Sequence, residues 1–586
     1  MDQFLIIAYS RIIKTNQMTK KRGLTPKGWF ITILASIIIS VSFVAANTDN
    51  RNFEIVKNLD IFYSLFRELN SYYVDETDPE KLIKTGIDAM LETLDPYTTF
   101  IPEDEMDDFR FMTTGEYAGI GALITKRGDY VVISEPYQGM PAQEAGLKAG
   151  DKILKIDGVS MKSQETHDVS EKLKGAAGTQ VKISVLRPGI DKEMEITINR
   201  RVIQINPVPY YGMINETTGI IILNNFTQNC AKEVEKAYKD LKQNKNMSKL
   251  ILDLRGNPGG LLDEAVKISN LFLPRGAEIV STRGKVSQWD KTYRAPREPL
   301  DTIMPMAILI NRGSASASEI VAGALQDHDR ALIIGQRSFG KGLVQTTRSL
   351  SYNSSLKVTT AKYYIPSGRC IQAVDYAKRN EDGSVAIIPD SLMKEFQTKG
   401  GRTVLDGGGI SPDITIDAEK YSNITIALMM QQTIFDFATR YASTTPSIES
   451  PEVFTLSDEL YEDFKTYVAG LNDFKYETES NNILKKLKKT AKEEKYYEEG
   501  KEAFLELEKV LKPNVVSSLD TAKNEIEELL AMELIRRYYF QKGAILYNIR
   551  FDDEIHTAAK TLANSAEYSG MLNGSILTHA GDKRYN

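Results

Sequence analysis

A serine and a lysine 25 positions apart, Ser316 and Lys341, are the residues of this chain whose types could support nucleophilic chemistry. A serine hydroxyl is a weak nucleophile and needs a neighbouring base. A lysine amine serves as that base only when it is neutral, and burial in an apolar pocket lowers a lysine pKa. Serine–lysine pairs are a known variant of the serine–histidine–aspartate arrangement. The simpler interpretation is a helix-capping serine and a solvated loop lysine, so the surroundings must decide.

The segment around these two residues predicts a unit that would bring them together. The apolar run Met306–Ile310 predicts a buried strand, Glu319–Gln326 a helix, and Ala331–Ile334 a second strand. A strand–helix–strand unit of this length is almost always right-handed, with parallel strands. Open α/β sheets place their sites at the carboxyl ends of such strands. Because Ser316 follows the first strand and Lys341 the second, we expect both at one edge of the sheet.

A glycine-rich turn earlier in the chain could supply hydrogen-bond donors to the same edge. Lys249–Leu254 predicts a buried strand, which ends in the turn Arg255–Gly260 before a further predicted helix. Unpaired N–H groups at such a turn point towards the carboxyl edge of the sheet. Acyl transfer needs donors where the oxyanion forms. Gly259 or Gly260, together with Ala317, are the candidate donors, and the sequence does not distinguish the two glycines.

Two other interpretations of the segment around Ser316 and Lys341 fit the sequence less well than a serine–lysine pair does. Gly335–Lys341 matches most of a phosphate-binding loop, but Gly342 replaces the serine or threonine that would hold magnesium. A strand rather than a helix is predicted after it. His328 is a rival base, but it lies twelve residues after Ser316 across a helix, which places it roughly 18 Å away.

The composition is that of a globular protein and excludes several classes of function. The chain has 586 residues and a net charge of −6, so nothing indicates a nucleic-acid partner. Its two cysteines, Cys230 and Cys370, are too few for a disulfide framework, and whether they pair is left open. The four histidines are scattered without a zinc-binding pattern. We therefore expect no metal and no organic cofactor.

An apolar segment near the N-terminus predicts export. Trp29–Ala46 contains 18 residues without a charge, enough to span roughly 27 Å as a helix. Lysines and an arginine precede it, so its N-terminal side should stay in the cytoplasm. Val44–Ala46 also resembles a signal-peptide cleavage site. Anchor and cleaved signal both remain open, and either one exports the rest of the chain.

The next segment, from Asn52 to Phe109, predicts helices. Its apolar residues recur at helical spacing on one face, namely Ile55, Leu59, Phe62 and Phe66. This face could pack on the core or on a second subunit.

The motifs GSASASEI and FGKGLVQ, with the spacing between them, resemble those of the carboxyl-terminal processing (tail-specific) proteases. The resemblance extends from about Asn52 to Ile416 and includes the DLRGNPGG turn. It implies that Ser316 is the nucleophile, that Lys341 is the base, and that Gln345 orients the lysine.

The segment Thr114–Arg201 resembles a PDZ domain, through AGLKAGDKILKIDG and the alternating runs that follow. Tyr117–Ile124 is similar to the carboxylate-binding loop of such domains, where glycines let backbone N–H groups approach a ligand. The resemblance implies that a substrate tail binds at this loop, at Gly119, Ile120, Gly121 and Ala122.

Together these observations predict a multidomain α/β protein with a helical N-terminal segment, a PDZ β-domain, a crotonase-like protease core built on βαβ units, and an all-helical C-terminal domain. The expected boundaries are residues 1–27 (cytoplasmic N-terminus), 28–46 (anchor or signal), 47–110 (helical segment), 111–201 (PDZ domain), 202–418 (protease core) and 419–586 (helical domain).

The predicted function is that of an exported serine endopeptidase that cleaves proteins near their C-termini, with the PDZ domain recognising the substrate tail. The alternative is a catalytically silent PDZ scaffold of the cell envelope. Expected partners are peptides with free C-termini, the membrane through the N-terminal segment, and a second copy of the chain or a regulatory protein. We expect an inner-membrane-anchored or secreted protein with its catalytic domain on the extracytoplasmic side.

Overall fold

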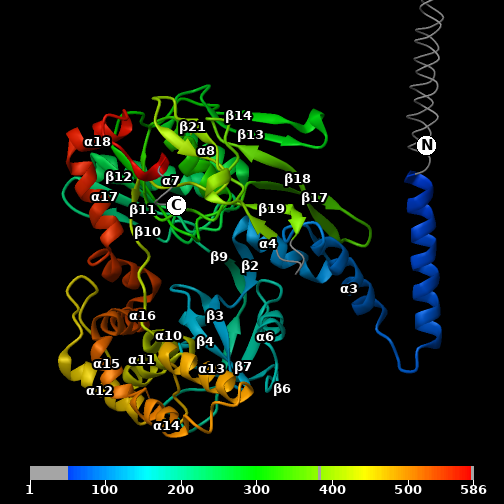
Figure 1. The fold of residues 1–586 in the computed structure, drawn as a ribbon, viewed down its shortest axis with the longest axis vertical. Coiled ribbons are helices and arrows are strands. Elements are labelled where there is room, and N and C mark those ends of the chain that lie inside the picture. Colours follow the sequence, from blue (N-terminus) through cyan, green and yellow to red (C-terminus); the bar gives the residue numbers. More distant parts are fainter. Residues whose placement is uncertain (1–50, 380–384, 512, 582–586) are drawn as a thin grey trace, which may run out of the picture. The chain divides into compact units, whose positions relative to one another are not determined.

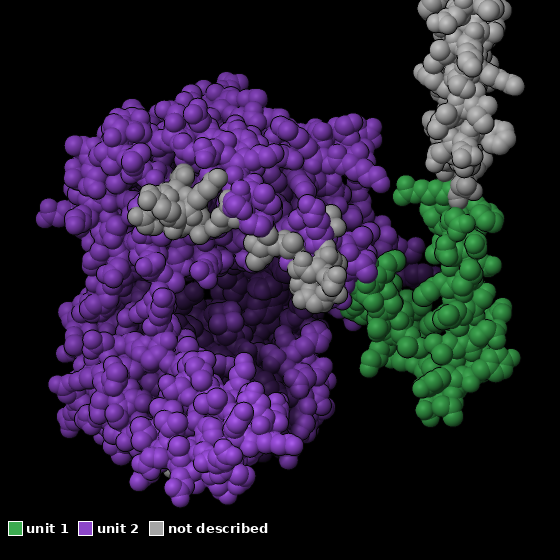
Figure 2. All heavy atoms as spheres, in the orientation of Figure 1, with its two compact units in different colours: residues 1–90 green, residues 91–586 purple. Residues whose placement is uncertain are grey.

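The computed structural model describes residues 51–379, 385–511 and 513–581. The chain divides into two compact units, residues 1–90 and 91–586 (Figure 2). The predicted apolar segment at residues 29–46 lies outside the described residues. Within the described part of the chain, no helix is both long and apolar enough to cross a membrane.

The described part of the first unit is helical, as predicted. Residues 51–72 form one helix, and α3 (Pro79–Glu92) follows. The predicted apolar face of the first helix is largely exposed, by 51% at Ile55, 63% at Leu59 and 50% at Phe62.

The protease core is built on a six-stranded sheet in the order β10-β11-β12-β15-β16-β23, whose first three strands are labelled in Figure 1. Its strands are parallel except for β10, which pairs antiparallel with β11. The strands are β10 (Tyr210–Met213), β11 (Thr218–Ile222), β12 (Lys249–Asp253), β15 (Met306–Ile310), β16 (Leu332–Gly335) and β23 (Ile414–Thr415). The predicted strand–helix–strand unit is present as β15, α9 (Ala317–Asp327) and β16.

Helices cover both faces of this sheet, which explains why β15 is an unbroken apolar run. Successive side chains of a strand point to opposite faces. Ile308 packs with the helices α7 (Cys230–Asn244), α8 (Leu262–Phe272) and α9. Leu309 packs against α17 (Asp553–Ala563) and α18 (Ser565–Leu572), near the C-terminus. The last helices of the chain are therefore part of the core.

A second, antiparallel sheet lies beside the first and carries the segment after Lys341. Its order is β1-β18-β13-β14, and β17 also pairs with β18. The strands are β1 (Thr99–Ile101), β13 (Glu278–Gly284), β14 (Lys291–Arg294), β17 (Leu343–Ser349) and β18 (Ser355–Tyr364). The segment after Lys341 is thus a strand, as expected, and not the helix that a phosphate loop would require.

The PDZ domain is a separate sheet with its own core. Its main strands follow the order β3-β4-β5-β7-β8, so β3 lies at an edge. They are β3 (Ala122–Arg127), β4 (Tyr130–Pro136), β5 (Lys152–Ile156), β7 (Gln180–Leu186) and β8 (Met194–Asn199). The ladder between β2 (Glu116–Gly119) and β9 (Arg201–Gln204) joins the domain to the protease core.

The C-terminal segment forms a helical domain around an apolar cluster, as predicted. Its helices are α10 (Asn423–Met430), α11 (Thr433–Thr444), α12 (Asp458–Ala469), α13 (Glu479–Glu493), α14 (Lys501–Val510), α15 (Val515–Thr521) and α16 (Lys523–Ile549). These helices lie beside the PDZ strands (Figure 1), and the ion pair between Arg127 and Asp436 joins them.

The long helix α16 is kinked where it meets the PDZ domain. Phe540 has φ 58° and ψ −166°, which interrupts the helical geometry. Backbone N–H groups released at such a break need another acceptor. The next residue, Gln541, donates its N–H to the Glu135 carboxylate of the PDZ domain at 3.0 Å.

Candidate active site

Ser316 lies on a sharp turn between β15 and α9. Its φ of 55° and ψ of −111° are strained for a residue with a Cβ. Gly259 approaches the same turn so closely that an added Cβ would lie 2.8 Å from the Ser316 Cβ and 2.7 Å from the Ala315 oxygen. The glycine turn and the serine turn are therefore packed backbone against backbone at the carboxyl edge of the sheet.

The buried carboxylate of Glu319 ties the two predicted catalytic residues together. It accepts the backbone N–H of Ser316 at 2.8 Å and that of Lys341 at 2.9 Å. Its other oxygen accepts the Gly340 N–H at 2.7 Å and the Ser338 hydroxyl at 2.5 Å. Burial raises the pKa of Glu319 to about 7, although these hydrogen bonds oppose the rise.

Glu319 is not among the site residues predicted from the sequence. The signal was present, because a serine followed three residues later by glutamate is a capping-box pattern. That pattern predicts the local bond to the Ser316 N–H, but it says nothing about the loop that carries Lys341.

Lys341 lines the same cavity as Ser316. Burial, together with the nearby charge of Lys357, lowers the pKa of Lys341 to about 8, against the opposing effect of Glu319 and Asp95. The amine lies over the ring of Tyr97, 4.2 Å from its centroid. Among the described hydrogen bonds, none joins the Lys341 amine to the Ser316 hydroxyl.

Gln345 also lines this cavity, but its amide group bonds elsewhere. It donates to the Thr359 hydroxyl of β18 at 3.2 Å, across the bulge where β17 and β18 shift register. Its predicted role in orienting Lys341 stays a prediction.

A tyrosine on β18 fixes the backbone of both predicted catalytic residues. The buried hydroxyl of Tyr363 lies 3.1 Å from the Ser316 carbonyl oxygen and is also within hydrogen-bonding distance of the Lys341 carbonyl oxygen. Strand β18 therefore fixes the position of the Ser316 turn relative to the Lys341 loop. This role of Tyr363 was not predicted from the sequence.

The structure distinguishes the donors proposed for the oxyanion. The Gly259 N–H is already used, because it donates to the Asn257 side-chain oxygen at 2.9 Å. Within the described hydrogen bonds, the N–H groups of Gly260 and Ala317 have no acceptor. Gly260, with φ 143°, has a conformation that favours glycine.

A cavity of about 780 Å³ joins these groups, and the face of the second unit drawn in Figure 2 is deeply hollowed. The protease core contributes Ser316, Lys341, Gln345, Gly259, Gly260 and Ala317 to its lining. The PDZ domain contributes Leu123, Glu135 and Tyr137, and the helical domain Arg536 and Gln541. The site is therefore enclosed by three parts of the chain.

The predicted PDZ loop, Gly119–Ala122, is not part of this lining. Its Gly121 has φ 75°, and a Cβ there would lie 2.6 Å from the Met140 Cβ. The carbonyl oxygens of Ile120 and Gly121 accept backbone N–H groups at 2.8 and 3.0 Å, which holds the loop in place. Burial raises the pKa of the adjoining Tyr117, and hydrogen bonding from the Gly121 and Ala122 N–H groups opposes that rise.

Three residues considered in the sequence, namely His328, Cys230 and Cys370, do not line the cavity. His328 follows the last residue of α9, where its Nε2 lies 2.7 Å from the Glu278 carbonyl oxygen. Cys230 and Cys370 are both free thiols.

The sequence matches "Peptidase family S41" over residues 217–378, "PDZ domain" over 132–187, and "Probable PDZ-protease, C-terminal helical domain" over 424–562. A carboxy-terminal-processing protease from Bartonella bacilliformis is 39% identical over 347 residues, which are 59% of this chain and 79% of the relative. A probable CtpA-like serine protease from Staphylococcus aureus strain COL is 34% identical over 404 residues, 68% of this chain and 71% of the relative.

A solved structure of a photosystem II D1 C-terminal processing protease is 30% identical, covers 61% of this chain and 92% of its own, and has a TM-score of 0.34.

A PDZ domain joined to an S41 core defines this chain as a serine-type peptidase. More particularly, it belongs to the carboxy-terminal-processing proteases of peptidase family S41. The comparisons support the predicted enzyme and not the alternative of a silent scaffold.

Proposed function

We propose that this peptidase cleaves protein substrates near their C-termini, with Ser316 as the nucleophile and Lys341 as its general base. The observation that carries the assignment is that the Glu319 carboxylate binds the backbone of both residues at the edge of one cavity. The lowered pKa of Lys341 supports it, because a base must be neutral near the working pH.

In this mechanism the Lys341 amine leaves the Tyr97 ring and takes the proton of the Ser316 hydroxyl as its oxygen attacks the scissile carbonyl. The N–H groups of Gly260 and Ala317 stabilise the oxyanion. The Lys341 ammonium then protonates the leaving amine as the peptide bond breaks. Water, deprotonated by the same amine, releases the acyl group from Ser316.

Labelling with a fluorophosphonate tests the assignment. The unmutated protein should be labelled at Ser316, and Ser316→Ala should lose both labelling and peptide cleavage without unfolding, since it removes one oxygen. Substantial cleavage by Ser316→Ala would exclude Ser316 as the nucleophile.

We propose that the loop Gly119–Ala122 binds the C-terminal carboxylate of the substrate. The N–H groups of Gly121 and Ala122, which hydrogen-bond the Tyr117 side chain in this structure, would bind the carboxylate in its place. The neighbouring strand β3 lies at an edge of the PDZ sheet, where an extended peptide could pair. The relatives' description as carboxy-terminal-processing proteases agrees with such a substrate.

We propose that the chain is exported and anchored through the apolar segment Trp29–Ala46, with the catalytic domain outside the cytoplasm. The support is the length of that segment and the positive charges before it. A C-terminal tag should be accessible to a protease added to spheroplasts. Protection of the tag in intact spheroplasts would contradict the proposal.

We also propose that the exposed apolar face of helix 51–72 contacts a second copy of the chain. Its exposure at Ile55, Leu59 and Phe62 supports an interface, because monomers rarely expose such a continuous stripe. Leu59→Glu should shift a dimer to a monomer in sedimentation. An unchanged mass would argue against this face, and binding of a regulatory protein there would be the alternative.

A further inference from the structure

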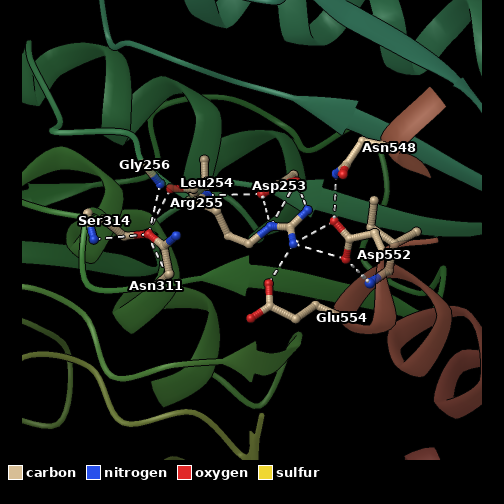
Figure 3. Close-up of polar contacts among 11 residues, drawn as sticks. Asp253, Leu254, Arg255, Gly256, Asn311, Ser314, Asn548, Asp552 and Glu554 are labelled. Atoms are coloured by element: carbon tan, nitrogen blue, oxygen red, sulfur yellow. Dashed lines mark hydrogen bonds and ion pairs between the residues drawn. The ribbon is translucent and has the colours of Figure 1, made fainter. Parts of the chain in front are cut away.

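The glycine turn of the proposed active site is held by the C-terminal helices, which lie outside the segment matched to peptidase family S41, residues 217–378. Arg255, the first residue of that turn, directs its guanidinium into a cluster of three carboxylates (Figure 3). Its Nε and Nη2 donate to Asp253, at the end of β12, at 3.0 and 2.6 Å. Its Nη1 binds Asp552 at 2.8 Å and Glu554 at 2.5 Å, and both of these come from the C-terminal helices.

The cluster is largely shielded from water. The side chain of Arg255 is 18% exposed, and those of Asp552 and Glu554 are 8% and 12% exposed. A shielded ion pair is screened little by salt, and removing one partner leaves the other charge without compensation. These contacts therefore constrain Arg255 far more than a surface pair would.

Asp552 is itself fixed, and Glu554 belongs to the same anchored helix. Asp552 caps α17 by accepting the Ile555 N–H at 3.0 Å, and Asn548 donates to its other oxygen at 3.2 Å. Helix α17 is anchored in turn by apolar residues, such as Leu562, packed on the central sheet. The two carboxylates therefore have fixed positions, and they fix the position of the Arg255 side chain that binds them.

From Arg255 the constraint reaches the proposed reacting groups through a short stretch of backbone that is hydrogen-bonded to the neighbouring loop. The next residue, Gly256, donates its N–H to the Asn311 side chain at 2.9 Å, and the Ser314 hydroxyl donates to the Leu254 oxygen at 2.8 Å (Figure 3). Asn257 accepts the Ala315 N–H at 3.0 Å. The position of Arg255 therefore affects both the turn that ends at Gly260 and the loop that carries Ser316.

We propose that Asp552 and Glu554 are positioning residues: through Arg255, the C-terminal helices hold the glycine turn where its N–H can stabilise the oxyanion. The proposal rests on the proposed function of Ser316 and its oxyanion donors. A purely structural role would lower only the stability of the protein, whereas a positioning role also lowers the rate of acyl transfer by the folded protein, at constant substrate affinity.

The test uses the full chain with Glu554→Gln, and Asp552→Asn as a second variant, because asparagine also caps a helix. Loss of an oxyanion donor costs about 10²–10³-fold in kcat, so a displaced donor should cost about 10-fold, with KM within twofold. Inhibition by a peptide boronic acid, whose adduct with Ser316 is tetrahedral, should weaken by the same factor. Binding of an uncleaved product peptide should not change.

The matched control is Asp553→Asn, which removes a carboxylate from the exposed residue between the two. It makes the same change of charge in the first turn of α17 and should leave kcat and boronate inhibition unchanged. In a double-mutant cycle, the combined effect of Arg255→Lys and Glu554→Gln on kcat should be clearly smaller than the sum of the two single effects, because both variants break the same contact.

Unchanged kcat and boronate inhibition in both helical variants would overturn the proposal. A change confined to KM or to the melting temperature would also overturn it and assign the cluster a structural role. Failure of the proposed function would look different, because the unmutated protein would then show neither labelling at Ser316 nor inhibition by the boronic acid.

Discussion

The carboxylate of Glu319 accepts the backbone N–H groups of Ser316 and of Lys341 with a single oxygen, at 2.8 and 2.9 Å. One buried atom therefore sets the separation between the turn of the proposed nucleophile and the loop of its base. The second oxygen, which binds Ser338 and Gly340, prevents the carboxylate from rotating.

Glu319→Gln should reduce kcat/KM by at least 10-fold. Glutamine has only one acceptor oxygen, so its NH2 group would face two of the four donors, and each buried unsatisfied donor costs about 1–3 kcal/mol. Steady-state kinetics with a fluorogenic peptide, together with thermal unfolding, measure both effects. Glu567→Gln, at a partly exposed position in α18, is the control. Unchanged kinetics in a folded Glu319→Gln protein would remove the link between the two residues.

Lys341→Arg should be nearly as inactive as Lys341→Ala. Arginine stays protonated in proteins and cannot accept the serine proton. His328→Ala should retain activity, since His328 bonds the Glu278 carbonyl at the far end of α9. The assignment would have to be abandoned if Lys341→Arg kept near-full activity while His328→Ala lost it.

Lys341→Met should stabilise the protein at pH 7. The folded pKa of Lys341, about 8, lies below its ordinary value of 10.5 because burial disfavours the charged amine. Between pH 8 and 10.5 the unfolded chain therefore binds more protons than the folded protein, so the free energy of unfolding rises with pH across this range. As pH falls through about 8, the stability contributed by this group is lost. At pH 7 the variant should gain on the order of 1 kcal/mol, since partial exposure limits the effect. Equal or lower stability in chemical denaturation would contradict the lowered pKa.

The parallel unit β15–α9–β16 could be predicted because each of its elements is encoded locally. The apolar run Met306–Ile310, the small residues after it and the helical spacing need no distant partner. Strand topology then places Ser316 and Lys341 at one edge, and the structure brings both to one cavity as expected.

The contacts that tune this site could not be predicted, because they depend on segments distant in sequence. Tyr97 covers the Lys341 amine from a segment more than 200 residues away. The sequence did not indicate which element would cover Leu309, and the structure shows that it packs against α17 near the C-terminus. Gln345 bonds Thr359 because a bulge shifts the register of β17 and β18, and a bulge leaves no clear pattern in the sequence.

Gly121→Ala should impair cleavage of substrates with a free C-terminus. A Cβ at this position would meet Met140 at 2.6 Å and force the loop from its conformation. We expect KM to rise by about 10-fold for such a peptide, and the amidated peptide to be cleaved as poorly by the variant as by the unmutated protein. Gly128→Ala is a matched control, because Gly128 also has a positive φ but has open space around it. Equal cleavage of acid and amidated peptides by the unmutated protein would remove the PDZ loop from the mechanism.

Lys357→Met should move the pH dependence of the enzyme towards higher pH. Lys357 lines the same cavity as Lys341, and its charge is the largest contribution, after burial, to the lowered pKa of Lys341. Removing that charge favours the protonated Lys341 amine. The rising limb of kcat/KM against pH, expected near pH 8, should therefore move to higher pH. Because each pKa unit is tenfold in the neutral fraction, activity at pH 7 should fall by about 2–5-fold, while the plateau at high pH should be retained.

Lys357→Arg is the matched variant, because it keeps the charge on the same strand and should leave the limb near its original position. A loss of activity in Lys357→Met that is equal at every pH would mean that Lys357 acts by packing or by contact with substrate. A limb that moves to lower pH would contradict the electrostatic argument directly, because removing a neighbouring positive charge can only favour the protonated form of the Lys341 amine.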